Sequence, residues 1–250
     1  MAKTYRTSIV TQPLIGPIDC ACVIHGDAYN WGYVNRLYSM LSRNITQGIR
    51  LHVYTEASRL VPEPYIKHAL DDWKITGPKK SWWYKMQLFN PQHHAGPLLY
   101  FDLDTVIVKN IDWIVNLPLS YFWAVRDFKY LWRPIDFSVN SSIMWWDTRQ
   151  YQKVWEDFAV QDLDKITRKF RGDQDYINHA ILPEDKKLFN TELVKSWRWQ
   201  NLDGGYDFKK RSYYKPGAGT NCTDQTAIMV FHGDPKPGNL EDPVVLAYWK

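Results

Sequence analysis

The chain has 250 residues, of which 45% are hydrophobic, and a formal net charge of +4. This length and apolar content suffice for one large buried core, so we expect residues 1–250 to form a single catalytic domain. The mildly basic charge suits an anionic small substrate but is too small to indicate a nucleic-acid partner.

Two features bear on the cellular compartment. The basic residues Lys3 and Arg6 are followed by polar residues, Pro and Gly, so we expect no apolar signal-peptide core, and no segment reaches the roughly 18 apolar residues of a membrane span. The odd number of cysteines, Cys20, Cys22 and Cys222, argues against a disulfide framework. We therefore expect a cytoplasmic protein, with peripheral binding at the inner membrane surface as an alternative, and the oligomeric state stays open.

The predicted elements begin with a strand–helix–strand order, which indicates an α/β fold with parallel strands and an active site at the strand ends. Apolar patterning predicts, in chain order, strands over 21–25 and 50–55 around a helix over 33–43, a helical stretch over 83–89, strands over 98–108, 121–125 and 142–146, and helices over 150–158 and 173–181. Residues 201–224 are rich in Gly, Lys and Tyr and predict a long loop.

The apolar run over 98–108 carries two carboxylates, Asp102 and Asp104. Because side chains alternate along an extended strand, both would point to the same side and could converge on one divalent cation. Without a cation or hydrogen-bond donors, two ionised carboxylates among apolar neighbours would be costly. The alternative is a turn at the strand end in which the aspartates cap backbone amides.

Three further clusters strengthen the case for a ligand site. They are Lys85, residues 172–175 (Gly-Asp-Gln-Asp) and residues 232–237 (His-Gly-Asp-Pro-Lys-Pro). Two carboxylates and an imidazole can hold a dication and leave positions for phosphate oxygens, and the imidazole shifts the preference from magnesium toward manganese. The ammonium group of Lys236 could neutralise charge on a departing phosphate.

With these motifs the chain resembles the retaining glycosyltransferases of family 8, the group of glycogenin and the lipopolysaccharide galactosyltransferases, and within it a poorly characterised bacterial and phage branch. The resemblance covers most of the chain and rests on residues 101–104 (Phe-Asp-Leu-Asp), Lys85, 140–144 (Asn-Ser-Ser-Ile-Met), 172–175 and 232–237. It implies a GT-A fold, with a Rossmann-like mixed sheet flanked by helices. It also implies transfer of a sugar, with retention, from a nucleotide-diphosphate sugar.

The resemblance further implies a cofactor and its ligands. Asp102, Asp104 and His232 would bind manganese, with magnesium as the alternative, and Gly233 and Lys236 would contact the diphosphate. The donor would be a UDP-sugar by the leaning of the family, and the acceptor a glycan, a lipid-linked sugar or a protein. In better-studied members, additional residues separate the histidine from the glycine, whereas here they are adjacent.

Other roles concern the rest of the donor. Lys85 matches the basic residue that touches the donor, and Asn140 the asparagine near its sugar. Asp173 matches the carboxylate that holds sugar hydroxyls, and Gln174 the amide beneath the anomeric carbon, so these two and Lys236 form the implied catalytic set. Tyr29 resembles the aromatic residue that stacks on the base. Each also has a structural alternative: a solvated helix face for Lys85, a turn for Asn140, a helix N-cap for Asp173 and a helix cover for Tyr29.

Two other functions remain open. A strand that ends in Asp-x-Asp-Thr also describes haloacid-dehalogenase-like phosphatases, in which Asp102 would be the nucleophile, although Ile177 stands where a later acid is expected. Aromatic residues make up 16% of the chain and basic stretches occupy 165–171 and 209–215, so a non-catalytic carbohydrate-binding or nucleic-acid-binding module is the other alternative. His93 and His94 have no spaced carboxylate partner and are interpreted as loop residues.

Overall fold

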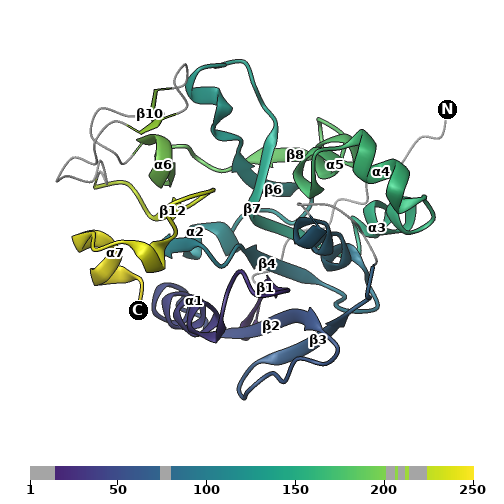
Figure 1. Cartoon of the computed structure of the whole chain (residues 1–250), viewed down its shortest axis with the longest axis horizontal. Coiled ribbons are helices and arrows are strands. Elements are labelled where there is room, and N and C mark those ends of the chain that lie inside the picture. The colour runs from purple at the N-terminus through teal and green to yellow at the C-terminus, as the bar shows by residue number, and fades with distance from the viewer. Residues whose placement is uncertain (1–14, 74–79, 201–205, 208–211, 214–223) are drawn as a thin grey trace.

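The computed structural model describes residues 15–73, 80–200, 206–207, 212–213 and 224–250 (Figure 1). At its centre lies a seven-stranded sheet with the order β3-β2-β1-β4-β7-β6-β8. Strands β3, β2, β1 and β4 are mutually parallel, β7 is antiparallel to both β4 and β6, and β6 is parallel to β8. The predicted α/β fold with a mixed sheet is therefore confirmed.

The strands of this sheet are β1 (Ile18–Ile24), β2 (Ile49–Glu56), β3 (Ile66–Leu70), β4 (Pro97–Phe101), β6 (Phe122–Arg126), β7 (Val139–Asp147) and β8 (Lys186–Leu188). A three-stranded sheet has the order β5-β12-β9, and its strands are β5 (Thr105–Ile107), β12 (Ile228–Val230) and β9 (Val194–Ser196). The two-residue strands β10 (Tyr206–Asp207) and β11 (Ser212–Tyr213) pair antiparallel. Apart from these two strands and Asp224, the predicted loop over 201–224 lies outside the described residues.

Helices cover both faces of the large sheet. The helices of the described residues are α1 (Trp31–Asn44), η1 (Lys80–Phe89), α2 (Asp112–Val115), η2 (Phe128–Leu131), α3 (Gln152–Ala159), α4 (Leu163–Lys169), α5 (Asp173–Ala180), α6 (Trp197–Gln200), η3 (Pro237–Asn239) and α7 (Pro243–Tyr248). One cluster of buried side chains joins the sheet to α1, α2 and α7, and the other joins it to η1, α3, α4 and α5. No helix in the described part of the chain has the length and apolarity to cross a membrane.

The first strand–helix–strand unit follows from its sequence. Helix α1 begins after Asn30, whose side chain accepts a hydrogen bond from the backbone N–H of Gly32 at 2.9 Å. Its buried residues Val34, Leu37 and Leu41 recur at helical spacing and form the stripe that packs on the sheet. The predicted strands over 21–25 and 50–55 correspond to β1 and β2, which pair parallel.

The predicted single strand over 98–108 is wrong. Strand β4 ends at Phe101 and β5 begins at Thr105, with a turn between them. The chain changes sheets here, because β4 pairs with β1 and β7, whereas β5 pairs with β12. The alternation of side chains along a strand therefore cannot explain the placement of Asp102 and Asp104, and the two carboxylates belong to a turn between two sheets.

Candidate active site

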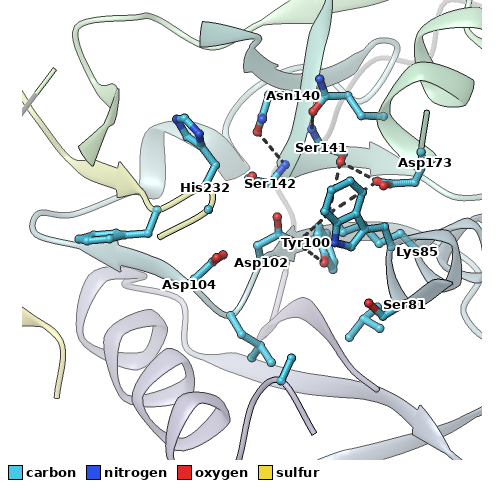
Figure 2. A pocket seen from close by; sticks show the side chains of 18 of the residues that line it. Ser81, Lys85, Tyr100, Asp102, Asp104, Asn140, Ser141, Ser142, Asp173 and His232 are labelled. Carbon is cyan, nitrogen blue, oxygen red and sulfur yellow. Dashed lines mark hydrogen bonds and ion pairs between the residues drawn. The ribbon is translucent and has the colours of Figure 1, made fainter. Parts of the chain in front are cut away.

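A cleft of about 490 Å³ opens where the β4–β5 turn faces the start of α5 and the segment after β12. This volume lies in the range of small-ligand sites. The cleft brings together all the residues for which the sequence predicted a role: Tyr29, Lys85, Asp102, Asp104, Asn140, Asp173, Gln174, His232, Gly233 and Lys236. Figure 2 shows Asp102 and Asp104 directed into the same pocket, with Lys85 and Asp173 beside Asp102.

Asp102 is fixed directly after β4. Its backbone N–H donates to the carbonyl oxygen of Ser142 at 2.7 Å, which continues the pairing of β4 with β7. Its Oδ1 accepts a hydrogen bond from the Tyr100 hydroxyl at 2.6 Å and lies 2.8 Å from Lys85 Nζ. Burial and the charge of Asp102 raise the pKa of Tyr100, so the phenol stays protonated and acts as a donor.

Lys85 lies between two carboxylates that line the cleft (Figure 2). Its Nζ lies 2.8 Å from Asp102 Oδ1, 3.6 Å from Asp173 Oδ2 and 3.3 Å from Ser141 Oγ. Burial lowers the pKa of Lys85, but the charges of Asp102 and Asp173 outweigh burial and raise it above its ordinary value. The side chain is only 12% exposed, so the alternative of a solvated helix face is wrong.

The start of α5 supplies Asp173 and Gln174. Gly172 occupies the N-cap position and Asp173 is the first helical residue, so the predicted N-cap alternative for Asp173 is wrong. The buried Asp173 accepts a hydrogen bond from Ser141 Oγ at 2.6 Å. Burial raises the pKa of Asp173, although Lys85 opposes this effect. Gln174 Nε2 donates to Asp127 Oδ2 at 2.6 Å, which fixes the orientation of the amide.

The Asp104 side chain contacts residues from the N-terminal and the C-terminal parts of the chain. Its Oδ2 accepts hydrogen bonds from the Tyr29 hydroxyl at 2.8 Å and from Lys236 Nζ. Burial, and then the charge of Asp102, raise the pKa of Asp104, although Lys236 acts in the opposite direction. Two neighbouring carboxylates in a buried site are stabilised by added positive charge, so this donor set suits a divalent cation.

His232 follows β12 and stacks on Phe128, with ring centroids 5.2 Å apart. Its Nε2 lies 2.6 Å from Ser196 Oγ, so a role as metal ligand would fall to Nδ1. Burial, reinforced by nearby cationic groups, lowers the pKa of His232 to about 3, and the neutral imidazole is the form that binds metals. The ligand atoms of His232, Asp102 and Asp104 are not all within 4.8 Å of one another in the described chain.

Gly233 turns the chain after His232. Its φ is +82°, a left-handed conformation that favours glycine, and a Cβ placed there would lie 2.6 Å from an Nη atom of Arg198. The turn allows Lys236 to reach back to Asp104. The course of the backbone from His232 to Lys236 therefore depends on glycine at position 233 and on the contact of Lys236 with Asp104.

Four supporting residues were not identified from the sequence: Tyr100, Asp127, Ser141 and Ser196. Each hydrogen-bonds to one of the predicted site residues. Ser141 lies within the 140–144 motif, which was a usable signal, whereas the other three belong to segments without a recognisable motif. Asn140 lies in strand β7, so its turn alternative is wrong, and its Oδ1 accepts a local hydrogen bond from the Ser142 backbone N–H at 3.0 Å.

The chain resembles known proteins in its structure. No family model matches the chain, and no curated protein matches it. Among solved structures, an active-site mutant of LgtC aligns with a TM-score of 0.60 and 13% identity over 92% of this chain and 96% of that chain. A second LgtC structure is described as a galactosyltransferase in complex with donor and acceptor sugar analogs, and it aligns with a TM-score of 0.57 and 12% identity over 91% of each chain.

Two longer glycosyltransferases share the architecture. WbbM, described as bifunctional, aligns with a TM-score of 0.58 and 12% identity over 93% of this chain and 49% of its own length. GlyE of Streptococcus pneumoniae TIGR4 aligns with a TM-score of 0.59 and 14% identity over 93% of this chain and 59% of its own length. The chain therefore has the GT-A fold, as the sequence predicted, with a Rossmann-like mixed sheet flanked by helices.

Proposed function

We propose that the protein is a metal-dependent glycosyltransferase that moves a sugar from a nucleotide-diphosphate sugar, most simply a UDP-sugar, to an acceptor hydroxyl with retention of configuration. One observation carries the proposal: a single cleft in a GT-A fold contains every residue that the family resemblance selected, from Tyr29 to Lys236. The structural neighbours LgtC, WbbM and GlyE, which are described as glycosyltransferases, support the same class.

The proposed cofactor is manganese, with magnesium as the alternative. The carboxylates of Asp102 and Asp104 and the Nδ1 atom of His232 would hold it. Bound there, the cation would supply positive charge to the oxygens of the diphosphate. The raised pKa of Asp104, which burial and Asp102 cause, fits a site that is stabilised by a cation.

In the proposed reaction, the bond between the anomeric carbon and the phosphate oxygen breaks, and its electron pair stays on the phosphate. The acceptor oxygen forms the new bond on the same face of the sugar and passes its proton to a phosphate oxygen, so no strong protein base is needed. Lys236 would neutralise charge on the departing diphosphate. Asp173 would accept hydrogen bonds from sugar hydroxyls, and Gln174, held by Asp127, would lie beneath the anomeric carbon.

The experiment is a screen of nucleotide sugars for binding and slow hydrolysis by the full chain, after chelation and defined addition of Mn²⁺. We expect at least one donor to be hydrolysed only with the metal. Asp104→Asn should reduce this turnover by about 100-fold, because the substitution removes one of the carboxylates that would hold the cation. The matched control is Asp157→Asn, an exposed position on α3.

Three results would contradict the proposal. If Asp104→Asn retains wild-type turnover after metal exchange, the metal assignment is wrong. If no donor turns over and a phosphoryl group is trapped on Asp102, the protein is a phosphatase. If sugars or oligonucleotides bind without metal or turnover, it is a binding module, and salt-sensitive affinity would identify the nucleic-acid form.

A further inference from the structure

A cluster of histidines lies on one face of the large sheet, outside the donor cleft. It contains Asp19 on β1, His52 on β2, His68 on β3, and His93 and His94 in the loop between η1 and β4. None of these residues lines the cleft. The cluster is largely shielded from solvent, because the side chains of Asp19, His52 and His94 are 16%, 9% and 11% exposed.

The strand register explains why three of these side chains share one face. Residues two apart on a strand face the same side, so Asp19 lies on the face of Ala21, and Ala21 pairs with His52. The next pairing, of Tyr54 with His68, extends this face to β3. Ala21 pairs with Tyr100 on β4, so Asp19 lies at the level of residue 98. The cluster is therefore about four residues, or about 13 Å along the strand direction, from Asp102.

The ligand atoms of Asp19, His52 and His94 all lie within 4.8 Å of one another, which no other trio of His, Cys, Asp and Glu in the described chain achieves. His52 Nε2 is 3.0 Å from Asp19 Oδ1, and His94 Nε2 is 4.0 Å from Asp19 Oδ2. Ligand atoms around a tetrahedral zinc ion are about 3.3 Å apart, given bonds of about 2.0 Å. To bind such an ion through these atoms, the trio needs a small contraction, and His94 Nε2 must release its hydrogen bond to the Pro97 carbonyl oxygen at 3.1 Å.

The outer contacts also suit a metal site. His52 Nδ1 lies 2.8 Å from His68 Nε2, so it can donate to His68 when Nε2 carries a metal, as ligating imidazoles usually do to an outer partner. Burial, followed by the neighbouring imidazoles, lowers the pKa of His68 to about 4, and burial lowers the pKa of His94. Burial raises the pKa of Asp19, but hydrogen bonds from His52 and Arg50 outweigh it and lower the pKa to about 2. Burial therefore favours the neutral form of the His68 and His94 imidazoles, and Asp19 is an ionised carboxylate.

Two buried polar atoms provide an independent sign of a polar ligand. Tyr54 Oη and His93 Nε2 have no hydrogen-bond partner among the residues that the structure describes. Both rings pack on His68, with centroid distances of 4.5 Å for Tyr54 and 6.0 Å for His93. Because buried polar atoms in native proteins are rarely left without a partner, these two mark the cluster as a place that accommodates a polar ligand.

We propose that Asp19, His52 and His94 form a second metal site, separate from the donor cleft, which binds one Zn²⁺ ion. Two imidazoles and one carboxylate are a common zinc ligand set and leave a fourth position for water. Arg50 also pairs with Asp19, but its side chain is 55% exposed, and an ionised carboxylate has lone pairs for a further partner. The ion would tie the His94 loop to strands β1 and β2.

The test uses the full chain with Asp102→Asn and Asp104→Asn, so that the cleft carboxylates do not contribute, and calorimetric titration of the metal-free protein with Zn²⁺. We expect one ion per chain. Adding His94→Gln should weaken binding by at least about tenfold, a loss that even an outer partner of a metal site typically causes. The matched control is His179→Gln, an exposed histidine on α5, which should leave the affinity unchanged.

A second measurement guards against misfolding of the variants. Zinc should raise the urea midpoint of the Asp102→Asn, Asp104→Asn chain, because a ligand that binds only the folded state stabilises it. The rise should disappear with His94→Gln and persist with His179→Gln. Absence of zinc binding in the folded parent chain, or equal affinities for the two histidine variants, would overturn the proposal. Neither result depends on nucleotide-sugar turnover, so the outcome is independent of the proposed enzymatic function.

Discussion

Replacing Lys85 by Met tests whether its ammonium group stabilises the carboxylates of Asp102 and Asp173 in the wall of the cleft. The Lys85 side chain is 12% exposed, and its ammonium lies 2.8 Å from Asp102 and 3.6 Å from Asp173, which are 22% and 4% exposed. Met retains most of the length and apolar packing of the Lys stem but removes the charge. Removing one partner of a buried ion pair leaves an uncompensated charge and typically costs about 3–5 kcal/mol. We expect a loss of this size at pH 7.

The loss should depend on pH with a defined sign. The folded-state pKa of Asp173 is already raised by burial, despite Lys85, and removing Lys85 raises it further. A carboxyl group with a raised folded-state pKa binds its proton more tightly in the folded state than in the unfolded state. The ionised group therefore destabilises the fold above its folded-state pKa, and this destabilisation decreases as the pH falls below that pKa. The difference in stability between wild type and Lys85→Met should therefore shrink between pH 7 and pH 5. Lys85 itself stays charged throughout this range, because its own pKa is raised.

The assay is urea unfolding of both proteins at pH 7 and pH 5, with the slope of the transition checked for constancy. The matched control is Lys153→Met, because Lys153 makes an exposed ion pair with Asp157 on α3. Exposed pairs contribute little, so this variant should remain close to wild type at both pH values. If Lys85→Met and Lys153→Met have the same effect at pH 7, or if acidification does not narrow the gap, the electrostatic reasoning is wrong.

Two further variants test the backbone turn and a partly buried carboxylate. Gly233→Ala should destabilise the protein by about 1–2 kcal/mol, because residue 233 has a left-handed backbone conformation, and it should weaken donor binding. Adding Arg198→Ala to this variant should remove the 2.6 Å clash with the new Cβ but not the backbone cost. Urea midpoints would measure both effects. Glu56 has a pKa of about 2, because hydrogen bonds from Arg59 and the Gly26 backbone outweigh burial. This stabilisation is present above the ordinary pKa and is lost as the pH falls toward 2, so Glu56→Gln should destabilise the protein more at pH 7 than at pH 2.5, and equal effects would contradict the assignment.

Local patterns were enough to predict the first half of the sheet. The apolar runs over 21–25 and 50–55 and the helix between them have strong periodicity, and the corresponding elements β1, α1 and β2 are confirmed. Strand β3 was missed because residues 66–70 (Ile-Lys-His-Ala-Leu) are mostly polar or exposed at this sheet edge. The break between β4 and β5 was missed because apolar residues dominate both strands, so the run was interpreted as one strand, although the alternative of a turn at the aspartates anticipated the break.

The site was predictable where residues carry motif information, and unpredictable where tertiary contacts decide. Asp102, Asp104 and Asp173 stand in recognisable motifs, and the structure brings them to one cleft. In contrast, the proximity of His94 to Asp19 depends on how the loop before β4 folds back against β1. No sequence spacing records this contact: His94 lies in a loop, as the sequence predicted, but its proximity to Asp19 was not predicted.

The turn between the two sheets explains how residues distant in the sequence come to share one carboxylate. Strand β5 leaves the Asp102–Asp104 turn and pairs antiparallel with β12, so that Thr105 lies opposite Val230. The Phe231 backbone N–H then donates to the Asp104 carbonyl oxygen at 3.0 Å, which extends this pairing to the turn itself. The residues after Phe231 must therefore emerge beside Asp104, and Lys236 reaches its carboxylate. A shift of one residue in the pairing of β5 with β12 would move this contact by about 3.3 Å and would place alternate side chains of β12 on the other face. The small three-stranded sheet is thus as necessary to the site as the large one, because it sets the register of the C-terminal segment against the aspartate turn.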